Sequence, residues 1–495
     1  MPFATALAIA LVTRIVFRFD GLYGQDAFAY FRFARAIWPH LLHGAPLPLL
    51  YWPRGYPAAI AALLPLTGGG PLAGQLVSAL AMAGGAAATF GLVQELERRA
   101  ASDGQSPSRD ADPTARLVAG LCVAASGVSL RNSQVVMADG LAFGLTAMAL
   151  WAIARYLRAG RGGWLVLAAV GVAFGAVTRW QIGMLALPLG AALLVERPMS
   201  TSGESPRRWP WFVAAAAVGA LILGSQLWTA HAVPKSFAQH EWLQRWSPLN
   251  AFRRSFHTTE GAARYRFPVG VFYGVRAGWP DAFFPTLAVL ALAGAWSVWR
   301  GRRRIELLLL LGWPLVNWAF ISGIPYENPR FVWPSLPSIA ALAGLGLQAW
   351  RARLSPRGRA AATGLLVASL AAGLALGARE HAHTVAGKEK GLQLVAWIDA
   401  HVPPGTTLLQ AGGTMMSEHY GRTPIRDIYP LTPEGIGDLL AQACPCFYLA
   451  DVPDLGHRMA GLPPQIVFES LGRAPGLTPV AARPPYVLYR VGAAR

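Results

Sequence analysis

The sequence predicts an all-α polytopic membrane protein with about eleven transmembrane helices and a small C-terminal α/β domain outside the membrane. Of its 495 residues, 54% are hydrophobic and only 14% are charged, whereas soluble proteins carry roughly 25% charged residues. Apolar runs of about 17–25 residues recur along the chain, and each is long enough to cross a bilayer core as a helix. Arginine clusters alternate between successive loops, which is typical of oriented membrane proteins.

The charge and the motifs exclude several function classes. The formal net charge of +18 does not indicate a nucleic-acid partner, because the basic residues stand in short loops between apolar runs. The sequence has no Gly-rich phosphate loop followed by Lys-Ser/Thr, no His-Glu-x-x-His and no Gly-x-Ser-x-Gly elbow. Nucleotide-driven transport and zinc proteolysis are therefore unsupported. Three cysteines predict neither a disulfide framework nor a cysteine metal site.

The expected spans follow one another with short loops between most of them. Segment 1–17 lacks the charged start and the cleavage site of a signal peptide, so we interpret it as a retained first helix. A shorter apolar piece at 57–66 is expected to be a helix in the outer interface. The expected spans are 1–17, 71–94, 114–130, 135–154, 164–178, 182–195, 210–230, 282–299, 305–322, 331–349 and 361–378.

The arginines predict the orientation of these spans. Clusters such as Arg155 and Arg158 occupy every second loop, and the positive-inside rule makes those loops cytoplasmic. The N-terminus is then cytoplasmic, and the long loops at 18–56 and 231–281 face outward. We expect a transmembrane domain over 1–379 in a cell (inner) membrane. Residues 380–495 are expected to form a soluble extracytoplasmic α/β domain.

The tail carries the pattern of short helices and strands. We expect helices at 391–401 and 432–443, the second of which starts at a Thr-Pro-Glu sequence. Strands are expected at 406–409, 446–450 and 486–491. Alternation of these elements indicates a small α/β domain.

Two carboxylates at expected outer helix ends are candidate catalytic groups. Asp26 follows the first span and precedes an aromatic, basic, helix-like run, so it is either a helix N-cap or a general base or metal ligand. Asp139 lies near the outer end of the fourth span, where an acidic residue is costly and by default indicates a functional site. The alternative for Asp139 is a carboxylate that reaches outer water.

Three arginines are expected on the outward side, where positive charge is not used for orientation. They are Arg131, Arg179 and Arg330. A guanidinium can hold a phosphate with two parallel hydrogen bonds, so each is a candidate site for a donor phosphate or for a lipid headgroup. Arg330 has the strongest context, because it opens a span among aromatic residues. The loop at 231–281 also carries His257 and Glu260, a weak metal-binding signal.

These residues resemble the motifs of membrane-embedded C-type (GT-C) glycosyltransferases, in the superfamily of protein O-mannosyltransferases and lipid A aminoarabinose transferases. Asp26 with Tyr30 resembles the family's first acidic segment, and Pro53 to Pro57 resembles its Pro-rich segment. Asp139 to Phe143, Thr178-Arg179-Trp180 and Arg330 to Pro337 follow in family order. The second acid that is common beside the first is absent here, which leaves metal dependence open.

The resemblance implies monosaccharide transfer, with inversion, from a polyprenyl-phosphate sugar to a glycan, lipid or protein acceptor outside the membrane. Asp26 and Asp139 would be catalytic, and the three outward arginines would bind the donor phosphate. Tyr30, Arg54, Tyr56 and Glu327 are candidates for substrate binding. No cofactor is assigned with certainty, and a divalent metal ion stays an option. The alternatives are a lipid or glycan flippase and a non-enzymatic glycan-assembly protein.

Overall fold

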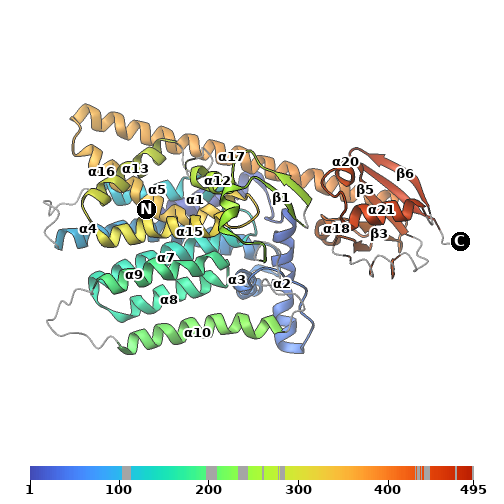
Figure 1. The fold of residues 1–495 in the computed structure, drawn as a ribbon, viewed down its shortest axis with the longest axis horizontal. Helices are drawn as coiled ribbons and strands as arrows, with labels where there is room; N and C mark the ends of the chain where they lie inside the picture. The colour runs from blue at the N-terminus through green and yellow to red at the C-terminus, as the bar shows by residue number, and fades with distance from the viewer. Residues whose placement is uncertain are drawn as a thin grey trace. The chain divides into compact units, whose positions relative to one another are not determined.

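A computed structural model gives the fold of the chain (Figure 1). It describes residues 1–495 except 103–112, 197–208, 232–243, 259–260, 277, 279–284, 430, 432–434, 436–437, 440–445, 474–475 and 493–495. The described residues form two compact units. The first comprises Met1–Leu22, Tyr30–Phe252 and Phe267–His383, and the second comprises Tyr23–Ala29, Arg253–Arg266 and Thr384–Arg495.

Unit 1 is a bundle of apolar helices. Among the described residues, six helices are long and apolar enough to cross a membrane, which supports a multi-pass membrane protein; their spans are Leu72–Ala101, Ala138–Ala159, Trp209–Gln226, Arg304–Ser322, Pro329–Arg351 and Pro356–His401. Shorter helices occupy the other expected spans, so the number of crossings stays a prediction. The bundle contains α1 (Pro2–Phe17), α2 (Gly24–His43), α3 (Gly55–Leu63), α4 (Leu72–Ser102), α5 (Thr114–Ala124), α6 (Gly127–Asn132), α7 (Ala138–Ala159), α8 (Gly162–Ala176), α9 (Ala186–Val195) and α10 (Trp209–His231).

The second half of the bundle includes short irregular turns between its helices. Its elements are α12 (Val269–Arg276), α13 (Pro285–Arg300), α14 (Arg304–Glu306), the π-helical turn η5 (Leu307–Gly312), α15 (Trp313–Ser322), the 3₁₀ turn η6 (Pro329–Ser335), α16 (Leu336–Arg351) and α17 (Pro356–His401). Two further 3₁₀ turns, η1 (Leu64–Thr67) and η2 (Trp180–Leu185), stand in the first half, and η4 (Pro248–Phe252) precedes α12.

Small residues allow the helices to approach closely. Helix α4 contacts α7, α7 contacts α8, and α13 contacts α16 (Figure 1). A Cβ atom at Gly294 of α13 would overlap the carbonyl oxygen of Leu342 of α16, and one at Gly346 of α16 would overlap that of Leu290. Glycines at such positions replace side-chain bulk with backbone contact, which is how membrane helices gain packing energy.

One buried carboxylate contacts three of the arginines that the sequence predicts to lie on the cytoplasmic side. Glu95 of α4 has no exposed side-chain surface, and Arg155 of α7 reaches it at 2.7 Å. Arg158 also contacts Glu95, and Arg98 lies 3.8 Å from it. Two spans are thereby joined at the ends that carry the predicted inner loops. The orientation itself stays a prediction.

Helix α17 differs from expectation, because it is one helix where a span at 361–378 and a separate helix at 391–401 were expected. It runs without a break over 46 residues. The polar stretch between the two expected helices contains alanine, glutamate and lysine, all of which are strong helix formers. The loss of hydrophobicity near Arg379 therefore does not end the helix.

Unit 2 contains a five-stranded mixed sheet with the order β4-β3-β5-β7-β6. The strands β3 (Thr407–Gln410), β4 (Ile425–Asp427) and β5 (Cys446–Asp451) are parallel, and β7 (Tyr486–Val491) and β6 (Leu477–Arg483) complete it antiparallel. Helices α18 (Thr414–Tyr420), α20 (Val452–Gly456) and α21 (Pro463–Arg473) connect them. A separate hairpin pairs β1 (Ser255–Thr258) with β2 (Gly261–Arg264).

The small C-terminal sheet region confirms the expected α/β character of the tail. The three expected strands are present, and β4 and β6 are additional. The expected helix at 432–443 lies largely outside the described residues. A short segment from the start of α2 also belongs to unit 2: the Phe28 ring lies 5.5 Å from the His419 ring and 5.9 Å from the Tyr420 ring.

Candidate active site

Asp139, in the first turn of α7, forms the centre of a charge cluster in unit 1. Its side chain is 1% exposed. One carboxylate oxygen lies 2.5 Å from Nη2 of Arg179, and the other lies 3.7 Å from Nη1 of Arg330. Two of the three arginines that the sequence predicts to face outward and one candidate carboxylate, far apart in sequence, thus meet at one place. With two cations and one anion, the cluster has a formal charge of +1.

The Arg179 side chain reaches Asp139 from the turn between α8 and η2. Its guanidinium also lies over the Phe331 ring, 5.6 Å from the centroid. The Phe331 carbonyl oxygen accepts hydrogen bonds from Nε2 of Gln181 at 2.8 Å and from Nδ2 of Asn317 at 3.1 Å. Sequence patterns did not single out Gln181 or Asn317. Asn317 is a polar residue within an apolar span, and this was the one sequence feature that could have indicated its role.

Arg330 is held by the residue that starts its turn. The Asn328 side-chain oxygen accepts a hydrogen bond from the Arg330 backbone N–H at 3.1 Å and from its Nε at 3.2 Å. This is a helix-capping arrangement that also aims the guanidinium. The side chains of Arg179 and Arg330 remain 14% and 19% exposed. Both cations can therefore still meet a ligand while they contact Asp139.

Glu327 lies three residues before Arg330, in the loop after α15. Burial raises the pKa of Glu327 from 4.5 to about 7. Its Oε1 atom is buried and accepts no hydrogen bond from the described residues. The Tyr273 hydroxyl fixes the loop on both sides of Glu327, because it donates to the Tyr326 carbonyl at 2.7 Å and accepts from the Asn328 N–H at 3.1 Å. No sequence pattern indicated Tyr273.

The Pro-rich segment from Pro53 to Pro57 lies next to the turn that contains Thr178 and Arg179. The Gly55 N–H donates to the Val177 carbonyl at 2.6 Å. A Cβ atom at Gly55 would lie 2.7 Å from the Thr178 hydroxyl oxygen, so only glycine fits here. Gly55 is thereby joined to the backbone two residues before Arg179. Arg54, its neighbour, donates its backbone N–H to Gln226 at 3.1 Å and places its guanidinium 5.5 Å from the Phe33 ring centroid.

Tyr56 connects this segment to α4. Its buried hydroxyl lies 3.0 Å from the Gly74 carbonyl and 2.9 Å from the Ser78 hydroxyl, which in turn donates to the Val135 carbonyl. The Tyr30 ring of α2 packs edge-on against Tyr56 at 5.3 Å. Both tyrosines are buried, so they support the site rather than present a surface to a ligand.

The remaining candidates lie elsewhere. Arg131 of α6 lies over Trp333 of η6, 6.0 Å from the ring centroid. Asp26 is partly exposed in the first turn of α2 and belongs to unit 2. The helix starts at Gly24, so Asp26 stands inside its first turn, where a negative charge is favourable. Among the described residues, no group of three His, Cys, Asp or Glu side chains could hold a metal ion. The side chains of His257 and Glu260 lie outside the described residues.

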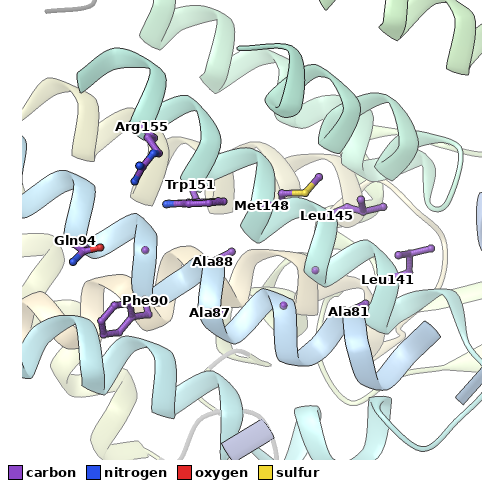
Figure 2. Close-up of a pocket in the computed structure, with 13 residues that line it drawn as sticks. Ala81, Ala87, Ala88, Phe90, Gln94, Leu141, Leu145, Met148, Trp151 and Arg155 are labelled. Atoms are coloured by element: carbon purple, nitrogen blue, oxygen red, sulfur yellow. The ribbon is translucent and has the colours of Figure 1, made fainter. Parts of the chain in front are cut away.

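An apolar groove follows the contact between α4 and α7. Figure 2 shows Gln94 and Arg155 at one end and Ala81 and Leu141 at the other, with Trp151, Met148 and Leu145 between them on α7. Its volume is about 530 Å³. Leu141 is only two residues after Asp139, so the groove begins within one helical turn of the charge cluster.

A model of the dolichyl-phosphate-mannose-protein mannosyltransferase family matches residues 109–228, which include Asp139 and Arg179. A sequence search of curated proteins finds no match.

Solved structures show the same fold. The chain is 16% identical to ArnT from Cupriavidus metallidurans bound to undecaprenyl phosphate, with a TM-score of 0.64 over 99% of this chain and 98% of that chain. The apo state of ArnT gives 15% identity and a TM-score of 0.63 over the same shares. Arabinofuranosyltransferase AftD from Mycobacteria is 17% identical, with a TM-score of 0.52 over 99% of this chain and 41% of that chain.

The fold is therefore that of GT-C type membrane glycosyltransferases, and the resemblance that the motifs indicated is confirmed. Neighbours of this class include both ArnT and AftD.

Proposed function

We propose that the protein transfers a monosaccharide from a polyprenyl-phosphate-linked donor to a hydroxyl group of a cell-envelope glycan, lipid or protein on the outer face of the membrane. The observation that carries this proposal is the cluster of Arg179 and Arg330 on Asp139. A positively charged, partly exposed pair of guanidiniums is suited to a phosphate. The GT-C fold supports the same class of reaction.

Asp139 holds the two arginines in place rather than taking a proton. Its two oxygens already contact the guanidiniums of Arg179 and Arg330, at 2.5 and 3.7 Å. Its buried position also leaves little room for an acceptor hydroxyl. We therefore assign Asp139 a positioning role. The acceptor proton passes instead to a more accessible carboxylate.

Asp26 is the proposed base, on the strength of its motif and its partial exposure. Glu327 is the second carboxylate with the required properties, because its pKa of about 7 matches proton transfer near neutral pH. In either case the acceptor oxygen forms a bond to the anomeric carbon as its proton moves to the carboxylate. The bond between that carbon and the phosphate oxygen breaks with inversion, and the phosphate leaves with the electron pair.

The arginines act on the leaving group. A lipid phosphate gains one negative charge as it departs, so a preorganised pair of guanidiniums stabilises the transition state more than the ground state. The donor's isoprenoid chain needs an apolar path, and the groove on α4 and α7 (Figure 2), whose lining on α7 starts two residues after Asp139, is our candidate for it. The structure of ArnT with undecaprenyl phosphate supports a polyprenyl phosphate as the donor carrier.

Reconstituted protein and a labelled polyprenyl-phosphate sugar would test the proposal. Transfer of label to an envelope extract is expected for the wild type. Arg330→Ala and Arg179→Ala should each reduce the rate about 100-fold or more, the scale for loss of one transition-state donor. Arg357→Ala is the matched control, since Arg357 is an exposed arginine on the predicted cytoplasmic side. Lipid movement across the vesicle without transfer would instead favour a flippase.

Asp26→Asn and Glu327→Gln separate the two candidate bases. Loss of transfer in the first and retention in the second is the expected result. The opposite result would identify Glu327 as the proton acceptor.

A further inference from the structure

Unit 2 has its own polar pocket, of about 540 Å³. It lies where the parallel strands β3, β4 and β5 end, and its lining includes their last residues Gln410, Asp427 and Asp451. In open α/β sheets, ligands bind outside the carboxyl ends of parallel strands. The β5–β7 pair beside it is antiparallel. The pocket thus occupies the edge of the sheet that usually serves binding.

Gln410 has an unused acceptor in this pocket. The residue is 7% exposed, and its Nε2 donates to the Gly412 carbonyl at 3.0 Å. That bond fixes the orientation of the amide group, so that Oε1 is the atom left to accept a hydrogen bond. Oε1 is buried and has no hydrogen-bond partner among the described residues. A buried acceptor without a donor costs roughly 1–3 kcal/mol, and a donor group on a ligand would remove that cost.

The carboxylates around Gln410 are acceptors as well. Asp427 accepts the Tyr429 N–H at 3.0 Å, and burial raises its pKa, while N–H groups of Tyr429 and Gly412 oppose that rise. Asp451 accepts the Asp454 N–H at 3.2 Å. Asp454 is bound by both Nε and Nη2 of Arg458, at 2.9 and 2.7 Å. Carboxylates have about four lone-pair sites each, so the contacts with backbone N–H groups leave acceptor capacity.

Aromatic rings and apolar side chains such as Leu455 and Met459 form the rest of the wall. Tyr448 and Tyr486 line the pocket. Tyr448 is fully buried and its hydroxyl donates to the Pro464 carbonyl at 3.0 Å, so the partly exposed Tyr486 is the ring of this pair that can face a ligand. Acceptor-rich walls beside aromatic rings fit a ligand that has many hydroxyl donors and an apolar C–H face.

Other ligand classes fit less well. A phosphate would bring its negative charge toward three aspartates and one arginine in the lining. A bound metal is not supported, because no described cluster of three His, Cys, Asp or Glu side chains could hold one. Hydroxyl-rich, uncharged sugars satisfy both the acceptors and the rings.

We propose that this pocket binds a neutral carbohydrate, a sugar residue of the acceptor glycan. Gln25 also lines the pocket, and it is the neighbour of Asp26 in the sequence. The acceptor role rests on the proposed function, whereas carbohydrate binding by unit 2 does not. Binding and transfer can accordingly be measured separately.

Saturation-transfer NMR on the full-length protein in nanodiscs would measure binding of mannose, galactose and arabinose oligosaccharides, with glucosamine and inorganic phosphate as comparison probes. Gln410→Met and Asp427→Asn keep the size of each side chain and remove an acceptor. Glu469→Gln is the matched control, because Glu469 is an exposed carboxylate of α21 outside the pocket lining. Thermal unfolding of each variant shows whether the fold is intact.

Saturable binding of at least one oligosaccharide is expected, weakened about tenfold or more in each pocket variant and unchanged in the control. Phosphate should not compete. The proposal is overturned if no oligosaccharide binds, if only glucosamine or phosphate binds, or if folded pocket variants bind as well as the wild type. Binding without any transfer would leave the carbohydrate site standing and refute the proposed function. In a working transfer assay, the pocket variants should raise KM for the acceptor more than they lower kcat.

Discussion

Replacing Asp139 with asparagine tests whether this carboxylate holds the two arginines together. At an effective dielectric constant of about 20, unit charges at the observed 3.7 Å attract by about 4–5 kcal/mol, and at 2.5 Å by about 6–7 kcal/mol. Desolvation offsets most of this attraction. Removal of one partner from a buried pair costs about 3–5 kcal/mol. Since the arginine side chains keep 14% and 19% exposure, we expect the lower end for Asp139→Asn, about 3 kcal/mol.

The measurement is the free energy of unfolding in detergent micelles with rising SDS, for Asp139→Asn, Arg179→Gln and the double variant. Because the two residues contact each other, the double variant should lose less than the sum of the single losses, by about 1–3 kcal/mol. Asp454→Asn is the control: its partner Arg458 is 52% exposed, so the loss should stay below about 1 kcal/mol. Single losses that add to within about 0.5 kcal/mol would refute the coupling.

Two further variants test other features. Burial raises the pKa of Glu327 from 4.5 to about 7, so the folded state binds a proton more tightly than the unfolded state, and stability should fall as pH rises between these values. Glu327→Gln should remove this part of the pH dependence in thermal unfolding scans; an unchanged profile would contradict the pKa assignment. Gly294→Ala should destabilise the bundle by about 1–3 kcal/mol, because the new methyl group overlaps the Leu342 carbonyl. Gly163→Ala, where nothing lies within 4 Å, should be neutral or slightly stabilising, and equal losses in both would argue against the close contact.

The helical bundle could be predicted from the sequence because long apolar runs leave few alternatives. Each expected span contains helix where the structure describes it, but the span at 114–130 is broken into α5 and α6, and the span at 135–154 becomes helical only at Ala138. The sheet was harder to predict. Strand β4 has only three residues, too few to show an alternation of apolar and polar residues. Strand β6 contains Pro479 next to a register shift at Ala481, and proline in a sheet is typical of an edge strand. Neither strand carried a readable pattern.

The candidate site was partly predictable. Topology placed Asp139, Arg179 and Arg330 on one side, and the structure brings them together. The ion pairs themselves depend on rotamers and on the helix crossings, which no local pattern encodes. Tyr273 is the clearest omission, because its role comes from two backbone groups more than fifty residues away.

The Tyr273 contacts also have a mechanical consequence. The α12 helix is tied to Tyr326 and Asn328 by one hydroxyl, and the Trp318 indole N–H of α15 donates to Gly270 of α12 at 2.9 Å. Asn328 in turn holds Arg330. The Tyr273 hydroxyl thus couples the position of α12 to the backbone on both sides of Glu327 and, through Asn328, to Arg330. A displacement of α12 would therefore displace the loop that carries both Glu327 and Arg330.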